Sequence, residues 1–205
     1  MSKPASLLSA KFTASLNRYD RLRKKAEFLF LESRLNKFEV ENIYAVLYVQ
    51  SVALFESTLE EIFIGLVSGE FKTKITKVNP KIHIKHPNLA RKVLYGVSPY
   101  FNWFPYDRNT EKISEIYFED NANPFALIDG DKKLLEKIIY IRNAIAHNSR
   151  HARLTFTRKV TADKLLPLRE KREPASFLRS IHTVNQTRYE YYTIEMRRII
   201  SNICS

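Results

Sequence analysis

The sequence predicts an all-α fold, a bundle of about four to five main helices. Two observations support this prediction. Over residues 5–36, 131–149 and 177–203, apolar residues recur at three- and four-residue spacings, which is the period of a helix with one buried face. Residues 39–68 are apolar on nearly every side of a helical wheel, so we expect a central helix that several neighbouring helices bury.

The first expected helix, residues 5–36, carries a basic face beside its apolar one. The apolar positions are Leu7, Leu8, Phe12, Leu16, Tyr19, Leu22, Ala26, Phe28 and Leu31, and the basic positions are Lys11, Arg18, Arg21, Arg23, Lys24 and Lys25. Such a basic face is usually solvated, and contact with nucleic acid is the alternative interpretation.

Glu56 follows the most apolar part of the helix expected at residues 39–68. A carboxylate at this point fits the rim of a core. It could also orient an arginine or a histidine through a charge-assisted hydrogen bond. We therefore keep Glu56 as a candidate supporting residue.

The stretch from Phe71 to Tyr106 contains no Asp or Glu, which is the clearest charge asymmetry of the chain. Its positive charges are Lys72, Lys74, Lys77, Lys81, Lys85, Arg91 and Lys92. The segment KITKVNPKIHIK alternates weakly and is broken by Asn79 and Pro80, which favours extended structure or a small hairpin. We interpret residues 69–128 as a basic, aromatic-rich insertion between the core helices of a single domain, residues 1–205.

Two further features of this insertion are predicted. A short helix is expected at residues 87–97. Residues 100–106, YFNWFPY, hold five aromatic side chains in seven positions. We expect these rings to pack against the helical bundle, and stacking on unpaired bases is the alternative.

The chain carries 34 Lys and Arg against 22 Asp and Glu, a formal net charge of +12. This excess favours a polyanionic partner, with nucleic acid ahead of a membrane surface. The single cysteine, Cys204, cannot form an intramolecular disulfide, so a reducing compartment is the natural setting. Since neither a signal peptide nor a run of about 20 apolar residues is present, we expect a cytoplasmic protein without a membrane span.

The helix expected from Asp131 to Ser149 has two apolar faces, and Asp131 is a suitable N-cap. A core stripe with spacings of 4, 3 and 4 residues consists of Leu134, Ile138, Ile141 and Ile145. The opposite face, where a solvated helix would carry Lys and Glu, holds Leu135, Ile139, Tyr140 and Ala146. We therefore expect a second body to cover that face.

Arg142, Asn143 and His147 form the group of residues that suggests chemistry. Arg142 is a planar cation suited to phosphate oxygens, and His147 can exchange protons near neutral pH. Asn143 and His147 share a face, whereas Arg142 lies about 140° from His147 and reaches it only through its length. A phosphodiester is the substrate that these groups would serve.

The arrangement RNAIAH near the end of a helix resembles the Arg-polar-x3-His signature of the HEPN superfamily (higher eukaryotes and prokaryotes nucleotide-binding domains). Residues 52–63, VALFESTLEEIF, are similar to the earlier helix of small HEPN proteins, including the RiboL-PSP-HEPN-like branch. The two segments cover about a fifth of the chain. The resemblance implies an HEPN-like helical bundle and a composite ribonuclease site built from two protomers.

Metal-free RNA cleavage needs one group that takes a proton from the 2′-hydroxyl and one that protonates the leaving 5′-oxygen. His147 suits either role, Arg142 can stabilise the transition-state phosphate, and Asn143 can hold the phosphate or a catalytic side chain. Because one chain offers one such histidine, we expect a homodimer. The resemblance also implies a toxin–antitoxin, antiviral or RNA-processing setting, with a cognate antitoxin or another operon product as partner.

Positive charge around this site marks the expected path of the RNA backbone. The expected RNA-binding residues are Arg150, Arg153, Lys72, Lys74 and Lys77. For the segment that follows His147, a solvated loop is the alternative.

Other interpretations stay open. Some HEPN proteins bind nucleotides, nucleic acids or proteins without cutting, and some are modified on a tyrosine at the position of Ser149. His147 could instead interact with the helix dipole. His83 and His86 lack Cys or carboxylate companions, and no glycine-rich phosphate loop is present, so we expect neither a metal nor a cofactor.

Overall fold

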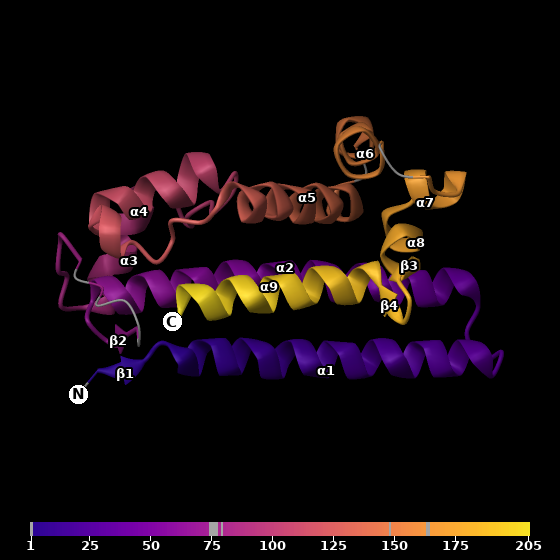
Figure 1. The fold of residues 1–205 in the computed structure, drawn as a ribbon, viewed down its shortest axis with the longest axis horizontal. Coiled ribbons are helices and arrows are strands. Elements are labelled where there is room, and N and C mark those ends of the chain that lie inside the picture. Colours follow the sequence, from indigo (N-terminus) through magenta and orange to yellow (C-terminus); the bar gives the residue numbers. More distant parts are fainter. Residues whose placement is uncertain (1, 74–77, 79, 148, 163–164) are drawn as a thin grey trace. The chain divides into compact units, whose positions relative to one another are not determined.

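The computed structural model describes residues 2–73, 78, 80–147, 149–162 and 165–205. These residues form nine α-helices and four short strands, which confirms the all-α prediction (Figure 1). The helices are α1 (Ser6–Leu31), α2 (Lys37–Val67), α3 (Pro87–Tyr95), α4 (Lys112–Tyr117), α5 (Asp129–Ala146), α6 (Arg150–Phe156), α7 (Leu168–Arg172), α8 (Pro174–Arg179) and α9 (Arg188–Ile203). The shorter elements are the π-helical turns η1 (Asp107–Glu111) and η3 (Thr157–Thr161), the 3-10 turn η2 (Asp120–Ala122), and the strands β1 (Lys3–Pro4), β2 (Phe71–Lys72), β3 (Ile181–Thr183) and β4 (Gln186–Thr187).

These elements form two compact units. The first unit contains residues 1–12, 55–136 and 197–205, and the second contains residues 13–54 and 137–196. Helices α1, α2, α5 and α9 each contribute one end to each unit. The proposed insertion lies wholly in the first unit, whereas the description of the chain as one domain stays a prediction. No helix among the described residues is long and apolar enough to cross a lipid bilayer.

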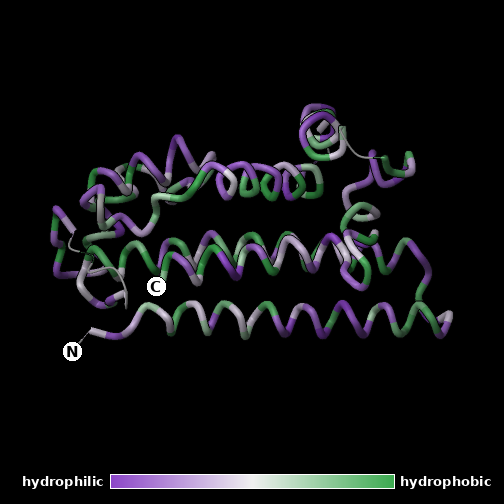
Figure 2. Tube along the Cα trace, in the orientation of Figure 1, coloured by the Kyte–Doolittle hydropathy of each residue, from purple (hydrophilic) through white to green (hydrophobic). Residues whose placement is uncertain are grey.

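The two long N-terminal helices lie where the apolar periodicity predicts them. Along α1, hydrophobic and hydrophilic residues recur turn by turn (Figure 2). Phe12, Leu16 and Ala26 are buried, but Leu22 and Leu31 are exposed, so the apolar pattern is wider than the buried face. Helix α2 starts with a reciprocal cap, because the Glu39 N–H donates to Asn36 Oδ1 (3.1 Å) and the Asn36 N–H donates to the Glu39 carboxylate (2.6 Å).

The core of the first unit is aromatic. The Phe63 ring of α2 lies 5.3 to 5.8 Å, between ring centroids, from four aromatic rings: Trp103, Tyr117, Phe118 and Phe125. Trp103, Phe104 and Tyr106 are buried, which confirms that most of the aromatic segment packs inside the fold. The predicted helix at residues 87–97 is α3, and it ends at Tyr95, two residues before Val97.

The basic segment before α3 only partly matches the expected hairpin. Strand β2 pairs with β1 in parallel, so its partner lies near the N-terminus and not in the same segment. Pro80 forms an isolated antiparallel bridge with Phe118. Most of KITKVNP lies outside the described residues, so the hairpin within it stays a prediction.

The start of α5 differs from the prediction. The helix begins at Asp129, and Asp131 lies in its first turn instead of capping it. Asp131 is 7% exposed, and its carboxylate pairs with the Arg198 guanidinium of α9, with one nitrogen–oxygen distance of 3.2 Å. The Asp131 carboxylate, which the local pattern assigned to capping, therefore forms an ion pair with Arg198, a residue far along the chain.

The final helix is also shorter than predicted. Residues 177–203 form the end of α8, a hairpin of β3 and β4, and α9. Ile181 and Val184, which fit the helical spacing, are 71% and 88% exposed in the hairpin. The chain turns at Asn185, whose φ of 68° lies in the left-handed region that asparagine tolerates better than most residues.

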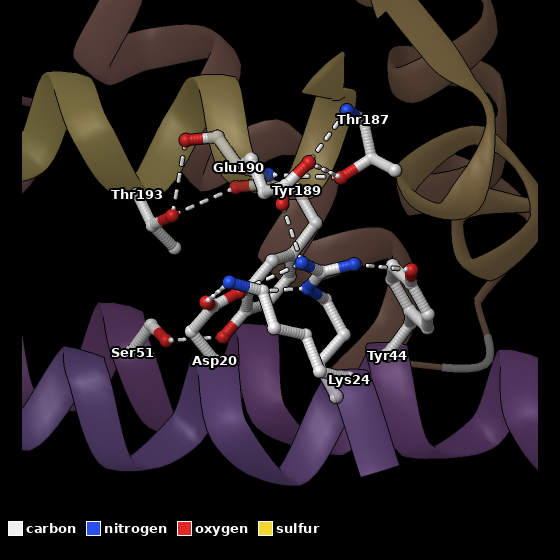
Figure 3. A network of polar contacts seen from close by, with 9 residues as sticks. Asp20, Lys24, Tyr44, Ser51, Thr187, Tyr189, Glu190 and Thr193 are labelled. Carbon is white, nitrogen blue, oxygen red and sulfur yellow. Dashed lines mark hydrogen bonds and ion pairs between the residues drawn. The ribbon is translucent and has the colours of Figure 1, made fainter. Parts of the chain in front are cut away.

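Arg23 belongs to a polar network in the second unit, and Figure 3 shows Asp20, Tyr44 and Glu190 of that network. Arg23 was expected on the solvated face of α1, but it is 5% exposed. Its Nε donates to Asp20 (2.9 Å), Nη1 donates to the Tyr44 hydroxyl (2.9 Å), and Nη2 pairs with Glu190. Glu190 also accepts from the Thr187 N–H (2.8 Å), so one carboxylate caps α9 and neutralises a buried guanidinium.

Candidate functional site

The predicted site residues lie at the C-terminal end of α5, in the second unit. Arg142 and Asn143 are half-buried, and His147 is exposed. The Arg142 Nη1 donates a hydrogen bond to Asn143 Oδ1 over 2.9 Å. Neighbouring side chains of α5 that carry no polar group, Ile138 and Ile141, are fully buried. Helix α5 therefore packs through its apolar face, and Arg142 and Asn143 lie at the edge of that buried face.

The buried face of α5 is rotated relative to the predicted stripe. Ile138 and Ile141 are fully buried as expected, but Leu134 and Ile145 are only half-buried. Leu135, which we placed on the opposite face, is fully buried.

The remaining residues of that opposite face are more accessible. Ile139 and Tyr140 are half-buried, and Ala146 is exposed. The surface available for a second body is therefore smaller than the sequence suggested, because it no longer includes Leu135.

His147 occupies the junction between two helices. Its N–H donates to the Asn143 carbonyl oxygen (2.9 Å) and closes the last turn of α5. Two residues later, the Ser149 hydroxyl accepts from the Ala152 N–H (3.2 Å) and caps α6. Residues 150–161 are therefore helical and not a loop, whereas the choice between solvation and RNA contact for the exposed Arg150 and Arg153 stays a prediction.

The basic residues that follow His147 line a pocket of about 560 Å³ in the second unit. The pocket contains the two expected RNA-binding arginines, Arg150 and Arg153, together with Arg172, Leu154, Thr157 and Glu173. The hydroxyls of Thr157 and Thr161 donate to the Lys171 carbonyl oxygen (3.4 and 3.2 Å), which joins α7 to η3. Three arginines against one glutamate give this pocket a net positive charge.

Arg172 is the pocket residue that the sequence analysis missed. It belongs to the charged run LREKR of α7. That run alone could have indicated a basic surface, but no local pattern shows that it lies beside α6.

The other expected site residues lie in the first unit or outside the described residues. Lys72 is exposed on β2, in the first unit, and Lys74 and Lys77 lie outside the described residues. Glu56 is half-buried and also belongs to the first unit. Its role in orienting Arg142 or His147 therefore stays a prediction.

Within the part of the chain that the structure describes, no group of three or more His, Cys, Asp and Glu side chains is arranged to hold a metal ion. Comparison of the chain with models of protein families, with curated proteins and with solved structures gave no match. The function must therefore be argued from the residues themselves.

Proposed function

We propose that this protein is a metal-independent endoribonuclease of the HEPN type, in which Arg142, Asn143 and His147 act on a phosphodiester. The observation that supports it best is the hydrogen bond of 2.9 Å between Arg142 and Asn143, one turn before the exposed His147. The arginine-rich pocket that starts at Arg150 adds a surface for the phosphates on either side of the cut bond.

The proposed reaction is an internal transesterification. A histidine takes the proton of the 2′-hydroxyl, the 2′-oxygen forms a bond to phosphorus, and the bond between phosphorus and the 5′-oxygen breaks. A second acid protonates the departing 5′-oxygen. The products are a 2′,3′-cyclic phosphate and a 5′-hydroxyl. Arg142 stabilises the additional negative charge on the phosphate oxygens in the transition state.

The need for two proton-transfer groups is the reason to propose a homodimer. A two-fold axis near Asn143 and His147 would place two histidines and two arginines at one phosphate. The half-buried Ile139 and Tyr140 and the exposed Ala146 are the surface that such a partner would cover. Light scattering at micromolar concentration should give the mass of a dimer, and a monomer there would contradict this part of the proposal.

The biological setting belongs to the same proposal. A toxin–antitoxin or antiviral role, with RNA as substrate and an antitoxin or another operon product as partner, follows from the family resemblance.

The test is cleavage of a labelled single-stranded RNA in EDTA by the wild-type protein and by His147→Ala. The substitution should lower the rate at least about 10²-fold, the low end for loss of a general acid or base. His151→Ala is the matched control, because His151 is also exposed and lies one turn later in α6. Cleavage that persists in His147→Ala, or that EDTA abolishes in the wild type, contradicts the site. RNA that is bound but never cut supports the non-catalytic binding module instead.

A further inference from the structure

A second pocket, in the first unit, combines aromatic rings with positive charge. Its volume is about 550 Å³, within the range of about 300 to 1,000 Å³ that small ligands occupy. Among the described residues, no Asp or Glu lines it. The lining residues are Leu94, Tyr95, Ser98, Tyr100, Phe101, Asn102, Arg108, Asn109, Lys112, Ile113 and Ile116.

The aromatic segment at residues 100–106 divides between the core and this pocket. Trp103, Phe104 and Tyr106 point into the core, whereas Tyr100 is 66% exposed and Phe101 is half-buried. The Phe101 ring packs edge-on against Trp103, with 4.8 Å between ring centroids. The pocket therefore has one ring that is fixed by the core and one that is open to solvent.

The backbone beside these rings is held by hydrogen bonds. The Asn109 side chain donates to the carbonyl oxygens of Asn102 and Phe104, both at 2.8 Å. The Asn102 side chain in turn accepts from the Phe104 N–H (3.2 Å). A surface held in this way loses little conformational entropy when a ligand binds.

Arg108 of η1 and Lys112 of α4 have different surroundings from Glu111, which lies between them in sequence. Arg108 and Lys112, four residues apart, line the pocket. Glu111 instead pairs with Lys132 of α5 (2.5 Å). This hydrogen bond, together with the charges of Asp129 and Asp107, raises the pKa of Lys132. The carboxylates of η1 are thus associated with Lys132, and the pocket side keeps its positive charge.

The carboxylate near the other wall of the pocket is also compensated. Glu60 interacts with the Tyr95 hydroxyl, and Arg91 pairs with Glu60 over 3.1 Å. The pocket therefore presents apolar rings and two cations without an opposing negative charge on its lining.

We propose that this pocket binds single-stranded nucleic acid, with an unpaired base stacked on Tyr100 and Phe101 and the adjoining phosphate held by Arg108 and Lys112. Every base has a π-face that can stack on an aromatic ring, but in a duplex that face is covered by its neighbours. The site is independent of the proposed cleavage, because it uses other residues and requires neither a 2′-hydroxyl nor His147.

The test uses an oligodeoxythymidine of about eight nucleotides, a length typical of single-strand binding sites. This probe lacks the 2′-hydroxyl and cannot be cut by transesterification, so binding is measured apart from cleavage. Fluorescence anisotropy of the labelled probe gives the affinity. The single tryptophan, Trp103, contacts Phe101, and its emission should change when the unlabelled probe binds. Oligouridine with the His147→Ala protein separates a preference for RNA from general single-strand binding.

Four variants locate the site. Tyr100→Ser should weaken binding about tenfold, whereas Tyr100→Phe should bind like the wild type because it keeps the ring. Arg108→Gln and Lys112→Gln should each weaken binding and reduce the slope of log affinity against log salt by about 1. Lys133→Gln is the matched control, since Lys133 is an exposed lysine of the first unit that does not line the pocket.

Two results would overturn the proposal. One is an affinity that Tyr100→Ser and the two glutamine variants leave unchanged. The other is equal binding of a duplex of the same length, with the same response of Trp103. Because Tyr100 is mostly exposed, the serine variant should keep the wild-type melting temperature, and circular dichroism checks this.

Discussion

Two arginines of the second unit, Arg23 and Arg142, differ in burial and in the groups that accept their hydrogen bonds. Arg23 is 5% exposed and bonds to two carboxylates, Asp20 and Glu190. Arg142 is half-buried, and its 2.9 Å bond goes to the neutral amide of Asn143. A buried arginine held by carboxylates has its charge compensated by the fold. We propose that the Arg142 charge instead acts on an anionic ligand, and variants of the two arginines distinguish a structural role from a role in cleavage.

The largest expected effect is on stability, from Arg23→Met. Removal of the guanidinium leaves Asp20 and Glu190 without their shared partner, and breaking a buried ion pair typically costs about 3 to 5 kcal/mol. Urea denaturation should show a loss of this size. Lys24→Met is the control, because Lys24 also pairs with Asp20 (3.0 Å) but its side chain is 66% exposed, and such pairs contribute about 1 kcal/mol or less. Equal losses in the two variants would show that Arg23 is not a structural centre.

Arg142→Ala should reduce RNA cleavage strongly and change stability little. Single-turnover cleavage of RNA should fall by about 10²-fold, as for the loss of one group that stabilises a transition-state oxyanion. The free energy of unfolding, measured by urea denaturation, should change by less than about 1 kcal/mol, since the side chain is partly exposed. A stability loss comparable to that of Arg23→Met, with cleavage reduced only in proportion to unfolding, would place Arg142 among the structural arginines.

Two carboxylates of the second unit, Asp20 beside Arg23 and Glu27 beside Arg179, should also make stability depend on pH. Burial tends to raise the pKa of Asp20, but hydrogen bonds from Lys24 and Arg23 outweigh it and lower that pKa. Burial likewise opposes the effect of Arg179, whose two hydrogen bonds of 2.9 Å lower the pKa of Glu27.

Because both folded-state pKa values are lowered, the stabilisation is fully present above the ordinary values of 3.8 and 4.5 and is lost as the pH falls through the lowered ones. Urea denaturation between about pH 6 and pH 3 measures this loss. Glu27→Gln should make the curve shallower. If stability depends on pH identically in Glu27→Gln and in the wild type, Glu27 does not contribute to the pH dependence.

Local patterns predicted the long helices well because α1 and α2 are built from residues close in sequence. They failed where a distant residue decides the outcome. Arg23 and Glu190 are 167 residues apart, so no window of sequence could show that this basic residue is buried. Ile181 and Val184 match a helical spacing, yet the turn at Asn185 places them in a hairpin.

For the candidate site, too, the sequence predicted local relations and missed those that depend on distant residues. Arg142 and Asn143 lie at the end of α5 and His147 follows it directly, so their order along the chain already placed them within two turns of each other. The hydrogen bond between Arg142 and Asn143 was not predicted, because a helical wheel gives the direction of a Cα–Cβ bond and not the path of a long side chain. Arg172 was missed because its partner arginines lie on a different helix.

The smallest expected effect belongs to Asn143, and it distinguishes orientation from direct contact. If Asn143 acts by holding the Arg142 guanidinium, Asn143→Ala removes one hydrogen bond to a side chain that remains charged and present. The rate of RNA cleavage should then fall about fivefold, equivalent to about 1 kcal/mol.

A double-mutant cycle separates the two roles. In the Arg142→Ala protein there is no guanidinium left to hold, so adding Asn143→Ala should cost nothing further. If Asn143 instead touches the phosphate itself, the fivefold loss should reappear in that background, and the two effects should multiply. The single-turnover rates of the four proteins give the coupling directly. Full multiplicativity would mean that the 2.9 Å hydrogen bond between the two side chains has no part in catalysis.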